Sequence, residues 1–221
     1  MPPSLLTTYW DQLYAQRTPE QSSWYQPYPT VSLSLFAETG LPFDAPIVDV
    51  GSGLSPFLNE LLAQGYFNLI ATDCSATALD QHCRALPSAQ AERVLWVVDD
   101  VTASEHLPLL DPVLLWHDRG LLHTLRSPAQ IATYCRLLHH MVDAHGWVLL
   151  AVRAPTAAPV STPDAGLLVQ PYTTAEIAAL LGPSYTLHTA REETHQPPQG
   201  ALQPYTHVLF RRNDTRREGK W

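Results

Sequence analysis

The sequence has few cysteines, few charged residues and no long apolar run, and each shortage excludes a class of protein. Charged residues make up 15% of the chain, and no uncharged apolar run approaches the roughly 18 residues that a membrane-spanning helix needs. The three cysteines among 221 residues form neither a CxxC motif nor an even set for disulfide pairing. We therefore expect free thiols in a reducing cytoplasm, at Cys74, Cys83 and Cys135.

Basic residues are also scarce. The chain has 13 Lys and Arg against 21 Asp and Glu, which gives a net charge of -8. An acidic protein without basic stretches is not expected to bind nucleic acid or an anionic membrane through its overall field. Residues Met1 to Ser4 lack the basic and apolar regions of a signal peptide. We therefore expect a soluble, cytoplasmic protein.

The length and composition predict one domain. With 221 residues, of which 45% are hydrophobic, the chain can bury one substantial core and is short for two domains. We expect a single domain over residues 1–212, followed by a polar, disordered tail over 213–221. Residues 1–40 are expected to form an N-terminal helix and an aromatic region that covers a binding site as a lid. The alternative is that these aromatic residues only pack on the flank of the domain.

The most informative stretch is PIVDVGSGLS, residues 46–55. Ile47 to Val50 has the β-branched apolar character of a buried strand, and Gly51 to Gly53 breaks it into a tight turn. Ser55 can cap the helix that follows, and Pro56 suits its first position. A strand, a glycine turn and a helix make up half of a nucleotide-binding unit, in which a ligand can approach the backbone closely.

A carboxylate ends the next predicted strand, residues 66–73. Asp73 follows Gly51 by 22 residues, the spacing at which dinucleotide-binding folds place an acid that binds ribose hydroxyls. Two details disfavour a dinucleotide: Pro56 replaces the third glycine of that motif, and Asp49 would repel a pyrophosphate. A carboxylate at position 49 would instead attract a cationic amino-acid head group, so the chemistry favours an adenosyl amino acid.

Two further strands are expected to end in polar residues. Residues 94–98 form an apolar run, typical of a strand buried on both faces, and Asp99 and Asp100 follow it. Residues 112–116 form another run, followed by His117, Asp118 and Arg119. Because ligands of open α/β sheets bind outside the carboxyl ends of the strands, we expect these groups to gather at one rim.

These motifs resemble those of the class I, seven-strand S-adenosylmethionine-dependent methyltransferases. VDVGSG at residues 48–53 is similar to their first motif, Asp73 matches their ribose-binding acid, and VVDDV at 97–101 resembles the end of their third strand. The segments 9–11, 23–26 and 116–119, with His123, are similar to a bacterial branch of small methyltransferases, so the resemblance spans roughly residues 9–212. The usual third glycine, two residues after Gly53, is Ser55 here.

The resemblance implies an α/β fold, Rossmann-like, with a seven-stranded, mostly parallel sheet that has one antiparallel strand and helices on both faces. It also implies S-adenosylmethionine as cofactor. The cofactor-binding residues expected from it are Asp49, Gly51, Ser52, Gly53, Asp73, Cys74, Asp100, Val101, His117, Trp24 and Tyr25. Residues expected to face the acceptor, as catalytic candidates, are His117, Asp118, Arg119 and His123.

Several roles stay open at these positions. His117 and Asp118 could form a general base pair, but neighbouring side chains of a strand point to opposite faces, so they are not expected to share a metal ion. Asp118 and Arg119 could instead form an ion pair that shapes the floor of the site. His123 is a candidate base or a hydrogen-bonded structural histidine. No metal site is expected.

The function expected from these residues is methyl transfer to a small-molecule nucleophile, with no nucleic-acid or membrane partner. The alternatives are a protein-lysine methyltransferase, which DRG at 118–120 also resembles, and a non-catalytic module that binds S-adenosylmethionine. A nicotinamide oxidoreductase is disfavoured by Asp49 and Pro56. The sequence leaves the acceptor and the oligomeric state undetermined.

The remaining elements are expected from periodicity and capping residues. Helices are expected at 4–17, 31–37, 75–85, 127–144 and 173–181, and strands at 147–152, 185–189 and 205–211. A proline-rich insertion is expected over 153–166.

Overall fold

A computed structural model describes residues 5–156 and 169–213 and shows one seven-stranded sheet in the order β3-β2-β1-β4-β5-β7-β6. Strand β7 is antiparallel to both of its neighbours, and the strands from β3 to β5 pair in parallel. The predicted sheet is therefore confirmed. The strands are β1 Ile47–Val50, β2 Leu69–Asp73, β3 Val94–Val98, β4 Val113–Arg119, β5 Val142–Arg153, β6 Tyr185–His195 and β7 Gln203–Arg212.

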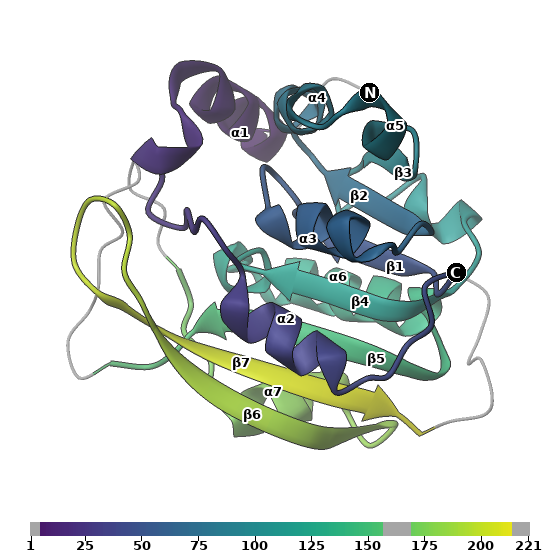
Figure 1. The fold of residues 1–221 in the computed structure, drawn as a ribbon. Helices are drawn as coiled ribbons and strands as arrows, with labels where there is room; N and C mark the ends of the chain where they lie inside the picture. Colours follow the sequence, from purple (N-terminus) through teal and green to yellow (C-terminus); the bar gives the residue numbers. More distant parts are fainter. Residues whose placement is uncertain (1–4, 157–168, 214–221) are drawn as a thin grey trace.

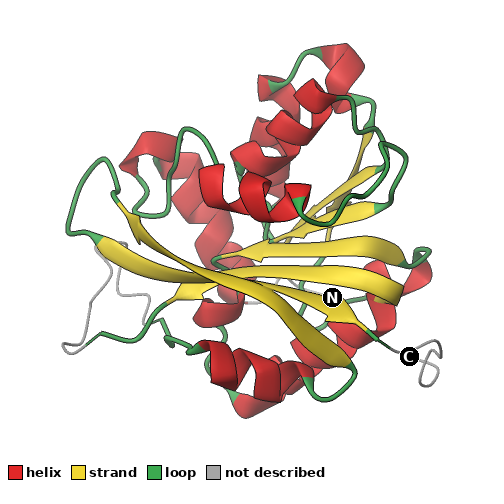
Figure 2. Cartoon of the chain, turned by 60° about the horizontal axis from the view of Figure 1, so that its bottom comes forward, coloured by secondary structure: helices red, strands yellow, loops and turns green. Residues whose placement is uncertain are grey.

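Helices cover both faces of the sheet, as Figures 1 and 2 show. The front face in Figure 1 carries α2 and α3, and the opposite face carries α6 and α7. The α-helices are α1 Leu5–Gln16, α2 Thr30–Ala37, α3 Pro56–Gln64, α4 Ala76–Ala85, α5 Ser88–Ala91, α6 Pro128–Met141 and α7 Thr174–Leu181, and the short 3-10 helices are η1 Pro19–Gln21, η2 Leu107–Leu109 and η3 Leu122–Thr124.

The predicted capping residues begin the helices that surround the sheet. The Ser55 hydroxyl accepts a hydrogen bond from the N–H of Phe57, and the Ser75 hydroxyl accepts one from Ala78. Ser127 and Thr173 each form a reciprocal capping box. Each cap satisfies N–H groups that the helix itself leaves without partners. Local sequence therefore determines where α3, α4, α6 and α7 begin.

Several predicted boundaries are wrong, and β6 in particular runs to His195 instead of ending at residue 189. Strand β2 begins at Leu69 rather than at residue 66, because Gly65 ends α3 with φ of 102° and the chain needs further residues to return to the sheet. Helix α6 ends at Met141 and not at residue 144, and β5 begins at Val142. Strand β4 runs to Arg119, so His117 to Arg119 belong to the strand itself and alternate between its faces.

The prediction that the third strand is buried on both faces is also wrong. Strand β3 lies at the edge of the sheet, and Leu95 and Val98 are 49% and 48% exposed. An apolar run identifies a strand, but only the strand order decides which strand has a neighbour on one side alone.

Two segments fall partly or wholly outside the described residues. The proline-rich insertion lies mainly there, and so does the expected tail over 213–221 apart from Asn213. The N–H of Asn213 donates to the carbonyl of Ser184.

Strand β3 connects to β4 without an α-helix. Only η2 forms in this loop, and Asp99 organises it. The Asp99 carboxylate accepts hydrogen bonds from the Ser104 hydroxyl at 2.6 Å and from the N–H groups of residues 105, 106 and 107. A buried carboxylate thus supplies the acceptors that a helix would otherwise provide for its own backbone.

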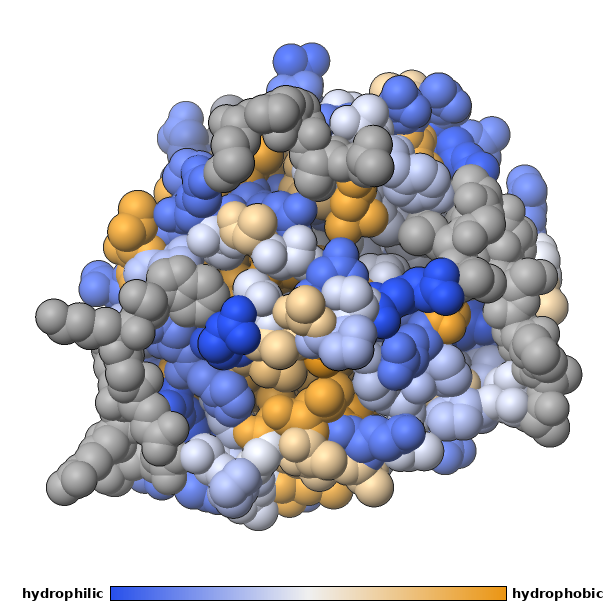
Figure 3. Space-filling model, turned by 180° about the vertical axis from the view of Figure 1, so that it is seen from behind, coloured by the Kyte–Doolittle hydropathy of each residue, from blue (hydrophilic) through white to orange (hydrophobic). Residues whose placement is uncertain are grey.

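The back of the molecule has a mixed surface. Figure 3 shows hydrophilic residues around a small hydrophobic area on this face. Scattered exposed apolar residues are common on globular proteins. None of the helices in the described ranges has the length and apolarity that crossing a membrane requires.

Asp99→Ala is expected to lower the free energy of unfolding by about 3 kcal/mol or more, because the loop loses four hydrogen bonds to a buried carboxylate. Urea denaturation measures this loss, with the exposed Asp111 changed to Ala as the matched control. A loss no larger than that of the control would show that Asp99 does not hold the loop.

Candidate functional site

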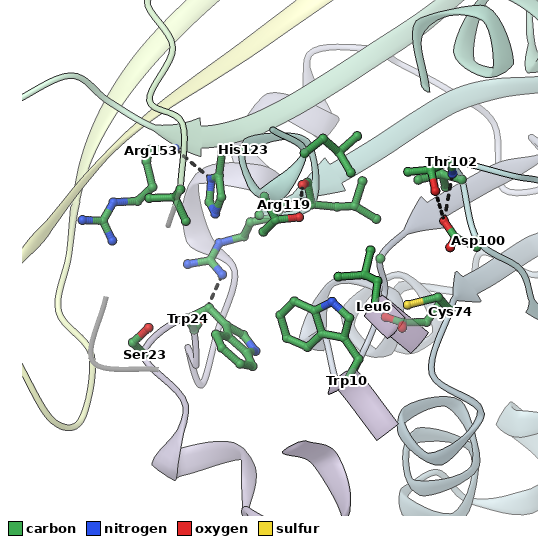
Figure 4. Close-up of a pocket in the computed structure, with 18 of the residues that line it drawn as sticks. Leu6, Trp10, Ser23, Trp24, Cys74, Asp100, Thr102, Arg119, His123 and Arg153 are labelled. Atoms are coloured by element: carbon green, nitrogen blue, oxygen red, sulfur yellow. Dashed lines mark hydrogen bonds between the residues drawn. The ribbon is translucent and has the colours of Figure 1, made fainter. Parts of the chain in front are cut away.

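Two adjoining cavities lie at the carboxyl ends of β1, β2 and β4. The main cavity has an empty volume of about 940 Å³ and the side cavity one of about 530 Å³, and part of each volume is open to solvent. The residues that line both cavities are Tyr14, Trp24, Gly51 and Arg119. The two cavities therefore adjoin and form one candidate site, and Figure 4 shows the main cavity.

The glycine turn separates the two cavities. Gly51 and Gly53 have φ of 63° and 47°, which side chains disfavour. A Cβ at Gly51 would lie 2.6 Å from Cδ1 of Leu121, and a Cβ at Gly53 would lie 2.3 Å from the Tyr14 hydroxyl. The turn therefore needs glycine for its own conformation and for the close approach of these two side chains. Ser52 lines the side cavity, and its buried hydroxyl has no described partner.

Asp49 lies at the bottom of the side cavity. It is buried, and its Oδ1 atom is 2.6 Å from Nδ1 of His117. The other ring nitrogen of His117 is 3.1 Å from the Ser32 hydroxyl, and the ring stacks on Phe57. These contacts fix the orientation of the Asp49 carboxylate. Its Oδ2 atom is buried and has no hydrogen-bond partner among the described residues, so the carboxylate can accept a hydrogen bond from a cation in the side cavity.

Asp73 lines the main cavity at the end of β2. Its two oxygens accept hydrogen bonds from the N–H groups of Gly53 and Ser75, at 2.9 and 2.8 Å. Burial raises the pKa of Asp73 to about 6, although these hydrogen bonds favour the charged form. Asp73 thus joins the glycine turn to the start of α4 and presents its carboxyl group to the cavity.

Asp100 and Val101 follow β3 and line the same end of the main cavity. The Asp100 carboxylate accepts hydrogen bonds from the N–H and hydroxyl of Thr102, as Figure 4 shows. Val101 is buried against the core. Cys74 also lines the cavity, and burial raises the pKa of its thiol. The acidic end of the main cavity therefore combines Asp73 and Asp100 with an apolar surface.

Aromatic side chains from the N-terminal region close this site from the other side. Trp10 and Trp24 have ring centroids 5.5 Å apart and both line the main cavity. The Trp24 carbonyl accepts a hydrogen bond from Nη1 of Arg119, and the Ser23 carbonyl accepts one from the His195 ring. Tyr25 lines the side cavity only. The segment predicted as a lid therefore lies over both cavities and is bonded to the sheet.

Arg119 and Arg153 line the other end of the main cavity. Their guanidinium carbons lie 5.1 and 5.7 Å from the ring centroid of Tyr205. Nε and Nη2 of Arg119 are buried without a hydrogen-bond partner among the described residues. The main cavity therefore has an acidic end and a basic end.

His123 lies on η3 and lines the main cavity together with these arginines. Its Nδ1 atom accepts a hydrogen bond from the N–H of Arg153 at 3.0 Å, so the proton of the neutral ring is on Nε2. Burial, together with the charges of Arg153 and Arg119, lowers the pKa of His123 to about 3. The lone pair that a general base needs is thus already used, and His123 can act only as a hydrogen-bond donor to the cavity.

The expectation that His117 and Asp118 face the acceptor is wrong. His117 is fully buried beneath the turn, between Asp49 and Ser32. Asp118 points to the opposite face of the sheet, where it accepts hydrogen bonds from the Tyr134 hydroxyl and from the N–H groups of Leu121 and Leu122. Alternation along β4 separates the two side chains, so neither a shared metal ion nor a base pair can form. Arg119 forms no ion pair with Asp118 either.

The described residues contain no group of three or more His, Cys, Asp or Glu side chains that could hold a metal ion.

No protein-family model and no curated protein matches the sequence, but solved structures match its fold. The Burkholderia thailandensis 1,6-didemethyltoxoflavin-N1-methyltransferase with bound S-adenosylhomocysteine is 20% identical with a TM-score of 0.66, covering 95% of this chain and 85% of that one. NodS, an N-methyltransferase from Bradyrhizobium japonicum in complex with S-adenosylhomocysteine, is 13% identical with a TM-score of 0.67, covering 92% and 98%. An S-adenosylmethionine-dependent methyltransferase from Anabaena variabilis is 15% identical with a TM-score of 0.68, covering 96% and 97%.

The chain has the class I S-adenosylmethionine-dependent methyltransferase fold. At these sequence identities the similarity establishes the fold alone. The chemistry must be inferred from the residues of the site. In this class I fold the cavities lie where the strand order reverses, between β1 and β4, which is the usual ligand position in open α/β sheets.

Sequence reasoning missed several residues of this site. Tyr14 reaches the glycine turn from α1, and Arg153, Gln203 and Tyr205 reach the main cavity from β5 and β7. No local motif marks them, because each comes to the cavity through strand pairing or helix packing. Asp11 belongs to the segment 9–11, which the sequence marked only through its resemblance to methyltransferases. In the structure its carboxylate accepts hydrogen bonds from the Ser75 hydroxyl and the Thr77 N–H, and these bonds tie α1 to α4.

Nitrogen-detected NMR of the histidine rings is expected to show His123 as the neutral Nε2–H tautomer from pH 8 down to about pH 4. A histidine with a lowered pKa is neutral when folded and charged when unfolded between about pH 6.5 and 3, so the folded state loses stability as the pH falls through this window. The spectrum of His123→Gln assigns the signal. Protonation near pH 6.5, or an Nδ1–H tautomer, would contradict the hydrogen bond to Arg153.

Proposed function

We propose that this protein is a methyltransferase that binds S-adenosylmethionine and methylates a small-molecule nucleophile. The fold supports this proposal, and so does the chemistry of both cavities. The observation that carries it is the free Oδ2 atom of Asp49, which is buried beside the glycine turn. A buried carboxylate oxygen without a partner is unfavourable unless a ligand supplies a donor.

The side cavity suits the amino-acid part of the cofactor. The α-ammonium group of S-adenosylmethionine would interact with Asp49, and the 2.6 Å hydrogen bond from His117 holds the Asp49 carboxylate in orientation. The pyrophosphate of a nicotinamide cofactor would meet the same carboxylate and be repelled. This difference favours S-adenosylmethionine over a dinucleotide, and Trp24 and Tyr25 would cover the ligand from above.

The acidic end of the main cavity suits the adenosine part. Asp73 would accept hydrogen bonds from the ribose hydroxyls, as acids at this position do in related folds. Asp100 would accept one from the adenine amino group, and Val101 with Leu6 and Trp10 would supply apolar contacts to the ring. His117 would act indirectly, by positioning Asp49, and not as a cofactor contact.

The residues of this chain would contribute positioning and exclusion of water. When bound, S-adenosylmethionine supplies an electrophilic methyl group for a single in-line displacement. Trp10 and Trp24 would shield that reaction from solvent, and Arg119 would hold the aromatic segment closed through the Trp24 carbonyl. His123 would donate its Nε2–H to the acceptor. Since the Nδ1 lone pair of His123 is already used, His123 would not deprotonate the acceptor. The acceptor is therefore expected to react through a lone pair of its own, and its orientation toward the methyl group to provide most of the rate enhancement.

The basic end of the main cavity favours a small molecule over a protein lysine. A lysine ammonium would approach Arg119 and Arg153 directly, and like charges repel each other strongly in a low-dielectric cavity.

Incubation with methyl-labelled S-adenosylmethionine and a fractionated cell extract separates the alternatives. Label in small-molecule fractions supports the proposal, label in protein favours the lysine alternative, and no label despite cofactor binding indicates a non-catalytic module.

Calorimetric titration with S-adenosylhomocysteine is expected to detect binding to the wild-type protein and no binding of NAD. Gly51→Ala should weaken binding by at least tenfold, because its Cβ would collide with Leu121 and displace the turn. Gly40→Ala is the matched control, since Gly40 has a φ of 62° and open space around it. Equal affinity in wild type and Gly51→Ala, or preferred binding of NAD, would overturn the proposed site.

The affinity for S-adenosylhomocysteine is expected to fall as the pH drops below about 6, by up to tenfold per pH unit, because protonated Asp73 loses its power to accept two hydroxyl hydrogen bonds. A raised carboxyl pKa has the opposite effect on the free protein: the folded state binds the proton more tightly, so Asp73 lowers stability as the pH rises from about 4 to 6. Titrations at pH 5 to 8 test this, and Asp73→Asn should bind weakly at every pH. A pH-independent affinity in the wild type would exclude the role of Asp73.

A further inference from the structure

The basic end of the main cavity has a fixed geometry. Arg119 on β4 pairs with Ala151 on β5, so Arg153 lies two residues further along the neighbouring strand and on the same face. Both guanidinium groups pack against the ring of Tyr205, which β7 places opposite Arg153. In Figure 4 both arginines lie beside His123, at the end of the cavity away from Asp100 and Cys74.

The charge of Arg119 is not neutralised by a hydrogen-bonded carboxylate among the described residues. Nη1 donates to the Trp24 carbonyl, and Nε and Nη2 are buried without a partner. Among the described residues, the Glu193 carboxylate acts electrostatically on Arg119, and its Oε2 is bonded to the His207 ring at 2.7 Å. A buried guanidinium in this state is unfavourable unless an anion joins it.

The remaining groups at this end are also hydrogen-bond donors or neutral. His123 presents its Nε2–H, and His195 is bonded to the Ser23 carbonyl. Burial raises the pKa of Tyr205, so its phenol remains neutral. The described carboxylates that line the main cavity are Asp73, Asp99 and Asp100, all at the opposite end.

We propose that the methyl acceptor is a small organic acid whose carboxylate binds between Arg119 and Arg153, with its apolar body against Trp24 and Leu121. The inference rests on the proposed function, because it assigns the acceptor of that same site. Guanidinium groups form paired hydrogen bonds with carboxylates, and the Tyr205 ring holds both planes in place. An acid bound in this way would have its body directed toward Gly51, where the two cavities meet.

The test uses protein saturated with S-adenosylhomocysteine and three probe pairs that differ only in charge: benzoate and benzamide, cinnamate and cinnamamide, and indole-3-acetate and indole-3-acetamide. Calorimetry measures each affinity. We expect at least one acid to bind ten times more tightly than its amide, and Arg153→Gln to reduce this ratio below threefold. Arg153→Lys should keep part of the preference, and Arg84→Gln, a change at an exposed arginine 79% accessible to solvent, should keep all of it.

The outcomes separate the two proposals. Failure of the wild-type protein to bind S-adenosylhomocysteine would overturn the proposed function. Normal binding of S-adenosylhomocysteine without a preference for any acid, or a preference that persists in Arg153→Gln, would overturn the anionic acceptor alone. Affinity for S-adenosylhomocysteine within threefold of wild type in Arg153→Gln would show that the variant is folded.

Discussion

The conformation of the turn after β1 is the constraint on which the site depends. Positive φ angles at Gly51 and Gly53 send the chain back over the end of the strand. The turn exposes the Gly53 N–H to Asp73 and leaves room for Leu121 on one side and Tyr14 on the other. It therefore connects three separate elements, and it determines where the two cavities meet.

The opposite charges at the two ends of the main cavity follow from the direction of the strands. Parallel pairing brings the carboxyl ends of β1, β2 and β3 to one rim, which places Asp73 and Asp100 together. Antiparallel pairing of β7 with β5 then adds Tyr205 beside Arg153. Burial shifts the pKa values at both ends, since it raises the pKa of Asp73 and lowers that of His123. A ligand that carries a cation and an adenosyl group, together with an anionic acceptor, would match this distribution of charge.

The N-terminal region is held over the site by bonds from both sides. Asp11 bonds to residues at the start of α4, while Arg119 and His195 bond to the backbone of the aromatic segment. Because Arg119 contacts the segment and lines both cavities, closure of the site and the basic end of the main cavity depend on the same side chain. Release of the segment for ligand entry would therefore change the environment of that cation.

The sequence by itself determined the local elements: Ser55, Ser75 and Thr173 mark helix starts because a cap needs only its nearest neighbours in the chain. It also determined that Asp49 and Asp73 lie at the carboxyl ends of strands and that Asp100 follows one, and hence that they share a rim. Only the tertiary structure decided that His117 is a buried partner of Asp49, that Asp118 faces the core, and that β3 is an edge strand. Arg153 and Tyr205 reach the site through pairing between strands far apart in sequence. Such contacts depend on strand order and on which face is buried, and no short segment of sequence contains that information.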